Sequence, residues 1–241
     1  MKKRPRIPLL FLPGLLCDRE VWEYQTRALA DIAECTTAEW NGEDSLAAMA
    51  QAALRIAPER FAVAGHSMGG RVALEIYRAA PERVQYVALL NTGYLPLPQD
   101  ASGEQEARNR YALLEIAKTQ GMRAMARQWL PPMISPARHA DGALTETIVE
   151  MFARKTPEIF EAQIRALLSR PDATPVLEQI RCPALLLSGR EDGWSPPARH
   201  AEMAKKVPGP STVVTVPDCG HMSTLEQPAA VAEAMRRWLT D

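Results

Sequence analysis

The sequence lacks the features that mark membrane-spanning and nucleic-acid-binding proteins. None of its apolar runs approaches the roughly 18 residues that a membrane-spanning helix needs. Its 28 basic residues are balanced by 29 acidic ones, which leaves a formal net charge of −1, and no long basic run is present. We therefore expect neither a membrane nor a nucleic acid as a partner. The length of 241 residues is enough for one α/β domain with a full core.

Cysteine is also scarce. The four cysteines form no C-x-x-C pair and show no spacing typical of a metal site; they are Cys17, Cys35, Cys182 and Cys219. Buried free thiols in a reducing cytoplasm are the expected outcome. No metal ion and no organic cofactor is predicted.

The first residues have a superficial likeness to a signal peptide. A basic stretch at residues 1–4 is followed by an apolar stretch at 7–17 that ends in a cysteine. Pro8 and Pro13 interrupt the apolar stretch, and Leu16 is too large for the usual processing site. We expect this segment to be part of the mature chain, because its first half reads as a strand.

Residues 61–74 form the stretch around which the chain is organised. Residues 61–64 are apolar and predict a buried strand, and residues 71–80 show apolar side chains at helical spacing. Between them lies Gly65-x-Ser67-x-Gly69, so the pattern is strand, sharp turn, helix. Such a turn lifts a serine hydroxyl clear of a sheet, and the pattern predicts a nucleophile elbow at Ser67.

Strand and helix patterns alternate over most of the remaining chain. This alternation predicts a doubly wound, mostly parallel sheet of about six strands with helices on both faces. The expected strands are 7–11, 34–38, 61–64, 84–90, 184–187 and 212–216, and the expected helices outside the elbow are 45–57, 197–207 and 228–239. Helix 228–239 should bury Val231, Met235, Trp238 and Leu239.

The alternation breaks between residues 94 and 170. Polar helical segments separated by prolines replace the strand patterns, at 104–118, 122–129, 145–154 and 157–168. We interpret residues 94–170 as a helical cap, or lid, inserted into a core made of residues 1–93 and 171–241.

Ligands of parallel α/β sheets bind beyond the carboxyl ends of the strands, so the residues that follow each strand matter most. Asp192 follows strand 184–187, and His221 follows strand 212–216. With Ser67 they place a hydroxyl, a carboxylate and an imidazole at one sheet edge. Histidine can take the proton of an attacking serine near neutral pH, and a carboxylate orients the imidazole and stabilises its charged form.

An anionic tetrahedral intermediate also needs hydrogen-bond donors. The backbone N–H of Met68 is one candidate, because it follows the nucleophile at the start of the helix. The loop after the first strand should supply the other, from Leu15, which follows Gly14.

Three motifs together resemble the α/β-hydrolase superfamily. They are G-x-S-x-G at 65–69, G-x-x-D-x-x-x-P at 189–196 and G-H-x-x-x-x-E-x-P at 220–228. The resemblance covers nearly the whole chain and implies a helical lid where the insertion lies. One departure is Pro13-Gly14 in place of the His-Gly that many relatives carry, which bears on the assignment of Leu15. The serine argues against the dehalogenase and epoxide hydrolase branches, which use aspartate.

Several other polar residues lie near these motifs in the sequence. Glu191 should point away from it, Asp218 is expected in a turn or at the surface, and Glu226 is expected to brace the His221 loop. The remaining histidines have structural interpretations: His66 as packing at the elbow, and His139 and His200 as surface residues.

Three tryptophans and three arginines are candidates for contacts with the substrate. Trp22, Trp129 and Trp194 are candidates for lining an acyl pocket, with core or lid packing as the alternative. Arg123, Arg127 and Arg138 could form a cationic patch for an acidic substrate or an acyl carrier, but a solvated helix face is the favoured interpretation.

The resemblance implies a serine hydrolase of the carboxylesterase and enol-lactonase group. Its expected substrate is a small ester, lactone or related acyl compound that is cleaved through an acyl-enzyme. Two alternatives stay open: hydrolysis of a carbon–carbon bond in a diketone, and a ligand-binding homologue with low turnover. The sequence makes no prediction of the oligomeric state.

Overall fold

A computed structural model describes residues 5–241 of the chain. Residues 1–4, the basic part of the segment that resembles a signal peptide, lie outside the described residues. Six parallel strands form one sheet in the order β2-β1-β3-β4-β5-β6. Their bounds are β1 Ile7–Leu12, β2 Ala33–Thr37, β3 Phe61–His66, β4 Val84–Leu90, β5 Ala184–Gly189 and β6 Ser211–Val216. The predicted fold class is confirmed.

The central strands are apolar because both of their faces are covered. Every residue of β3 and of β5 is buried, whereas β6 at the edge of the sheet is mostly exposed. The strand order reverses between β1 and β3, because the chain passes to β2 on one side of β1 and returns on the other. Ligand sites of such sheets lie outside the strand ends at this reversal.

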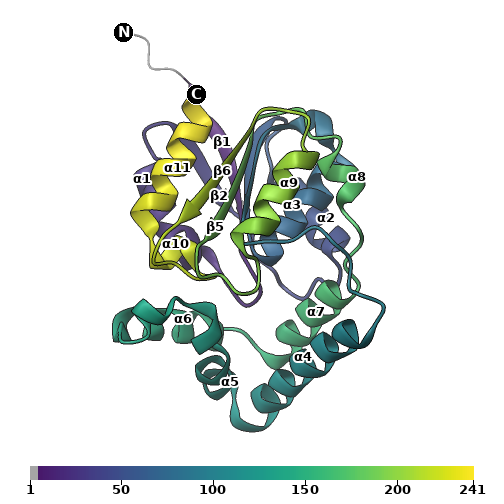
Figure 1. Ribbon diagram of the computed structural model, residues 1–241, viewed down its shortest axis with the longest axis vertical. Coiled ribbons are helices and arrows are strands. Elements are labelled where there is room, and N and C mark those ends of the chain that lie inside the picture. Colours follow the sequence, from purple (N-terminus) through teal and green to yellow (C-terminus); the bar gives the residue numbers. More distant parts are fainter. Residues whose placement is uncertain (1–4) are drawn as a thin grey trace.

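Helices cover both faces of the sheet, as Figure 1 shows. Helices α1 and α11 pack on one face, and α2, α3 and α9 pack on the other. The bounds of the core helices are α1 Glu23–Ala28, α2 Leu46–Ile56, α3 Met68–Ala79, α8 Thr174–Leu177, α9 Pro197–Lys206, α10 Ser223–Glu226 and α11 Pro228–Thr240, with short 3₁₀ turns at Arg19–Trp22 and Pro81–Arg83. Sequence patterns missed α1, α8 and α10, which are too short to show a clear apolar period.

The predicted buried face of α11 is confirmed. Val231, Met235, Trp238 and Leu239 are all buried. Ser45 caps α2 by accepting a hydrogen bond from the Ala48 N–H.

Helices alone fill the chain between β4 and α8. They are α4 Ala101–Gln120, α5 Met122–Trp129, α6 Gly142–Ala153 and α7 Pro157–Leu168, with 3₁₀ turns at Pro131–Met133 and Pro136–Arg138. In Figure 1 these helices lie together below the sheet, beyond the carboxyl ends of its strands. Arg154 joins this insertion to the loop after β1 through ion pairs with Asp18 and Glu20.

All four cysteines are free thiols, but only two of them are fully buried. Cys17 and Cys219 are buried, whereas Cys35 and Cys182 are half-buried. Burial raises the pKa of Cys17 to about 12, which keeps this thiol protonated. Among residues 5–241, no helix has the length and apolar character to cross a membrane.

Candidate active site

Ser67 lies at the sharp turn between β3 and α3. Its backbone has φ 56° and ψ −117°, a conformation that costs free energy for a residue with a side chain. The turn closes only because its flanking glycines have no Cβ: one on Gly65 would lie 2.1 Å from the Gly69 carbonyl oxygen, and one on Gly69 would lie 2.0 Å from that of Leu12. The elbow pattern in the sequence therefore forms the strained turn that it predicts.

The structure brings together the three side chains that the sequence placed at strand ends. The Ser67 hydroxyl donates to Nε2 of His221 over 2.8 Å, and Nδ1 of His221 donates to Oδ2 of Asp192 over 3.0 Å. Because the carboxylate can only accept, the proton of the neutral ring lies on Nδ1 and leaves Nε2 free to take the serine proton. This is the arrangement that general-base activation of a serine requires.

Asp192 is held as a buried anion. Burial by itself would raise its pKa, but the charge of His221 and hydrogen bonds from His221, Asn91 and the Ser195 N–H hold the pKa well below its usual range. Asn91 Nδ2 donates to Oδ2 over 2.9 Å, and the N–H groups of Trp194 and Ser195 both donate to Oδ1 over 2.9 Å. The carboxylate is thus charged and fixed in orientation at neutral pH.

Glu226 braces the loop that carries His221, as the sequence indicated. Its Oε2 accepts from the N–H groups of Gly220 and Ser135 over 2.9 and 2.7 Å, and its Oε1 accepts from that of Met222 over 3.0 Å. Ser135 belongs to the insertion, so one carboxylate ties the histidine loop to both parts of the chain. The His221 N–H also donates to the carbonyl of Met133 in the insertion.

His66 packs at the elbow as expected, whereas His200 is not the surface residue that the sequence suggested. His66 Nε2 donates to the His221 carbonyl over 2.7 Å, and burial lowers the pKa of His66 to about 4. His200 is fully buried because α9 turns it toward the sheet, where its Nε2 accepts from the Thr92 N–H. Burial likewise lowers the pKa of His200 to about 4.

Two backbone N–H groups next to Ser67 have no protein acceptor within residues 5–241. They belong to Met68, at the start of α3, and to Leu15, in the loop after β1. That loop runs close to the serine, since a Cβ on Gly14 would lie 3.2 Å from the Ser67 Cβ. Both predicted oxyanion donors thus lie in segments that flank Ser67, although Pro13 stands where many relatives have histidine.

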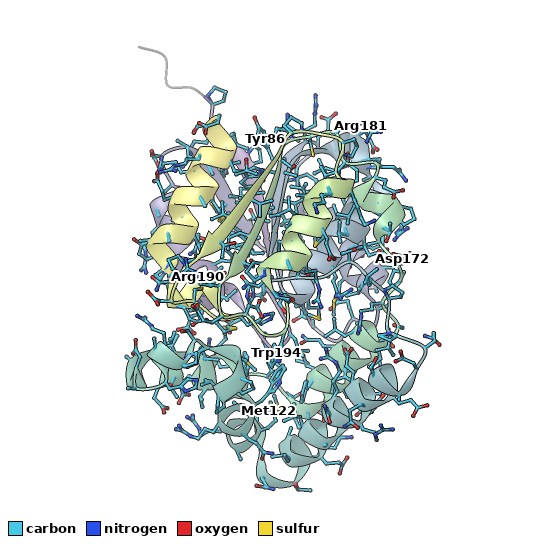
Figure 2. All side chains as sticks on the ribbon, in the orientation of Figure 1. Tyr86, Met122, Asp172, Arg181, Arg190 and Trp194 are labelled. Carbon is cyan, nitrogen blue, oxygen red and sulfur yellow. The ribbon has the colours of Figure 1, made fainter. Side chains whose placement is uncertain are left out.

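A cavity of about 980 Å³ lies at Ser67, between the strand ends and the insertion. Trp129 and Trp194 line it and stack with ring centroids 5.7 Å apart, and Trp194 also meets the edge of the His221 ring at 5.0 Å. Figure 2 shows Trp194 at the boundary between the sheet and the insertion. Trp22 does not line this cavity: it is fully buried and stacked on Phe11, so its assignment to the pocket was wrong.

The other acidic and histidine residues that the sequence offered for the site lie away from Ser67, Asp192 and His221. Glu191 is exposed and accepts from the Cys219 N–H, and Asp218 is exposed in a turn at φ 50°. His139 is exposed in the insertion. Arg123, Arg127 and Arg138 form ion pairs with Glu150, Glu146 and Asp141, respectively, as the solvated-face interpretation expects.

Two polar residues that support the site, Asn91 and Gln163, were not predicted from the sequence. Asn91 directly follows β4, at φ 49°, and so met the strand-end criterion that found the other residues. It donates to both Asp192 and the Gly220 carbonyl. Gln163, on α7 of the insertion, accepts from the Leu16 N–H, and no signal in the sequence connects two residues so far apart.

A parallel sheet with a serine elbow at its carboxyl edge is the architecture of an α/β hydrolase. The family comparison agrees with the geometry. Residues 9–234 match the model described as the alpha/beta hydrolase family. The chain belongs to this family and is a hydrolase.

The individual relatives share between 22% and 27% sequence identity with this chain. A pimeloyl-[acyl-carrier protein] methyl ester esterase of Nitrosomonas europaea is 26% identical over 77% of this chain and 73% of its own length. A thermophilic esterase from Thermogutta terrifontis, solved with malate bound, has a TM-score of 0.84 at 27% identity and covers 97% of this chain and 89% of its own. The enol-lactonase from Burkholderia xenovorans LB400 has a TM-score of 0.83 at 22% identity, over 100% of this chain and 94% of its own, a likeness of fold.

Proposed function

We propose that this hydrolase cleaves a small carboxylic ester or lactone through an acyl-enzyme on Ser67. The observation that carries the proposal is the continuous chain of hydrogen bonds from Ser67 to His221 to Asp192 at the wall of the cavity. Two relatives that are named esterases are 26% and 27% identical to this chain over the aligned residues, and they support the same class of reaction.

In the first half-reaction Ser67 Oγ attacks the carbonyl carbon while His221 Nε2 takes its proton. The protonated His221 then gives this proton to the leaving alcohol, which departs and leaves an ester on Ser67. In the second half-reaction His221 takes a proton from water, and the resulting attack releases the acid and restores Ser67. Asp192 stays ionised throughout and stabilises the imidazolium at each step.

The N–H groups of Leu15 and Met68 would hold the negative oxygen of the tetrahedral intermediate. Both lack protein acceptors in the described chain and flank Ser67. Donors that are already in place need no reorganisation during the reaction, which is the source of their effect on rate.

Residues 94–170 act in this proposal as a cap that closes the cavity and selects the substrate. The aromatic side chains of Trp129, Phe152 and Phe160 come from this segment and line the cavity, while Ser67 and His221 come from the sheet. The partner in the reaction is thus a small acyl compound. The four free thiols favour a reducing compartment, the cytoplasm.

The proposal is tested by intact mass after treatment with a fluorophosphonate, which reacts with an activated serine. We expect one adduct on the wild type, none on Ser67→Ala, and one on Ser169→Ala, in which an exposed serine outside the cavity is changed. Ser67→Ala should also lower ester turnover by about 10⁴-fold or more.

Three results would contradict the proposal. An adduct that persists in Ser67→Ala would place the nucleophile elsewhere. Labelling of Ser67 together with cleavage of diketones, and no cleavage of esters or lactones, would reassign the reaction to carbon–carbon bond hydrolysis. A folded wild type that binds acyl ligands but neither labels nor turns over would instead be a ligand-binding homologue.

A further inference from the structure

The cavity at Ser67 is also lined by a group of arginines. Four arginines are among its lining residues, Arg71, Arg110, Arg170 and Arg199, and Glu106 is the one glutamate or aspartate in that lining within the described chain. The lining therefore carries a formal surplus of three positive charges. We call these four arginines the arginine cluster.

Arg71 is the member next to the nucleophile. It lies on α3 four residues after Ser67, about one helical turn further along. Its Nη1 donates to the Leu95 carbonyl over 2.9 Å, and within residues 5–241 it has no carboxylate partner. Burial, and then the charges of neighbouring arginines, lower the pKa of Arg71 to about 9, which still leaves it cationic at neutral pH.

Glu106 neutralises only part of the cluster. It accepts from Arg170 over 2.7 and 2.8 Å and from Arg110 over 2.9 and 3.0 Å. Burial alone would raise the pKa of Glu106, but these hydrogen bonds and charges lower it to about 2, so its single negative charge is shared between two guanidinium groups. Arg170 is only 8% exposed, and its buried Nε has no acceptor in the described chain.

Arg199 adds a further cation from α9. Its Nη1 donates to the Trp194 carbonyl over 2.6 Å, and it too has no carboxylate partner among the described residues. By contrast, Arg123 and Arg127, at the solvent-exposed surface of the insertion, are each paired with a glutamate. Arg71 and Arg199 are therefore the two arginines of the cavity lining that form no ion pair within residues 5–241.

Leaving a partly buried cation without a counter-charge is unfavourable, and an anionic ligand removes the penalty. A guanidinium group presents paired N–H donors that match the two oxygens of a carboxylate. Ser67 and Arg71 line the same cavity, so one ligand can contact both.

We propose that the arginine cluster is a carboxylate-binding subsite, and that the substrates are half-esters of short dicarboxylic acids or lactones that carry a free carboxylate. The proposal rests on the proposed ester hydrolysis at Ser67 and specifies its substrate class. Arg71 binds the carboxylate, and Arg170 and Arg199 keep the surrounding potential positive.

The test compares two methyl esters of equal length. One is the monomethyl ester of adipic acid, and in the other a carboxamide replaces the free carboxylate. Methanol release gives kcat/KM for each, and the ratio of the two values is the readout, because a general loss of structure or activity cancels in it. The variants are Arg71→Gln, Arg71→Lys, which keeps the charge without the paired donors, and Arg123→Gln as the exposed control.

We expect the wild type and Arg123→Gln to prefer the anionic ester by at least about 10-fold. Arg71→Gln should lower this ratio by about 10- to 100-fold, mainly through KM, and Arg71→Lys should lie between. A wild-type ratio near one, or a ratio that Arg71→Gln leaves unchanged, would overturn the proposal.

Binding of adipate tests the subsite without relying on turnover. Adipate should raise the Tm of the wild type and of Arg123→Gln but not that of Arg71→Gln, and stronger stabilisation by inorganic phosphate than by adipate would overturn the choice of a carboxylate. If neither ester is cleaved and the fluorophosphonate does not label Ser67, the proposed hydrolysis fails. Adipate stabilisation that depends on Arg71 would still support the subsite in that case.

Discussion

One buried hydrogen bond joins the helical insertion to the loop that carries the Leu15 donor. Gln163 Oε1 on α7 accepts from the Leu16 N–H over 2.8 Å, and both residues are fully buried. Leu16 has φ 60°, a left-handed conformation that costs a residue with a side chain about 1–2 kcal/mol. The loop next to the nucleophile is therefore held in an unfavourable shape by a contact from the insertion.

Replacing Gln163 by leucine preserves much of the side-chain volume but removes the acceptor. A buried N–H without a partner costs about 1–3 kcal/mol. For a chain of this size each kcal/mol shifts Tm by about 2–4 °C, so a loss of about 2 kcal/mol lowers Tm by about 4–8 °C. If the loop relaxes, the Leu15 N–H moves as well. Complete loss of one oxyanion donor lowers kcat by about 10²–10³-fold, and a displaced donor should lower it by about 10-fold.

The measurements are thermal unfolding and steady-state kinetics on an ester that the wild type cleaves. Gln163→Leu should lower Tm and kcat while KM changes little, because an oxyanion donor acts on the transition state more than on the bound substrate. Gln120→Leu, the same change at an exposed position at the end of α4, should alter neither. A Gln163→Leu variant with wild-type Tm and kcat would refute the reasoning.

Two further predictions concern acid stability and the elbow. His66 and His200 have pKa values lowered to about 4, so the unfolded chain binds more protons than the folded one between about pH 6.5 and 4. The free energy of unfolding should fall as pH drops through this window, by up to about 1.4 kcal/mol per pH unit for each histidine. The plot of Tm against pH should be shallower for His200→Gln than for the wild type. A wild-type Tm that does not change across this window would contradict the prediction. Gly69→Ala should abolish folding or activity, since its Cβ would lie 2.0 Å from the Leu12 carbonyl oxygen. The control Gly142→Ala, whose Cβ would meet nothing within 4 Å, should unfold at the wild-type Tm. Circular dichroism and turnover check both variants, and an active Gly69→Ala would refute the packing argument.

Much of the scaffold could be predicted because its signals are local. The elbow glycines, the apolar strands and the order Ser67, Asp192, His221 are each read from a short segment, and parallel strands place their following residues at one edge. Glu226 was placed correctly for the same reason, since it lies five residues after the histidine that it braces.

Other features depended on how distant segments meet. Trp22 and Trp194 are both candidate pocket residues in the sequence, but Trp22 packs on Phe11 and Trp194 on His221. The burial of His200 depends on which way α9 faces, and the sequence pattern left that open.

The sequence by itself determined the fold class and which three side chains stand at neighbouring strand ends, because alternation, glycine spacing and strand-end position act over a few residues. Only the tertiary structure decided the charge and shape of the cavity. Arg71, Arg110, Arg170 and Arg199 come from α3, α4, the end of the insertion and α9, and each is unremarkable in its own segment. Their combined charge arises because folding brings four distant segments around one cavity.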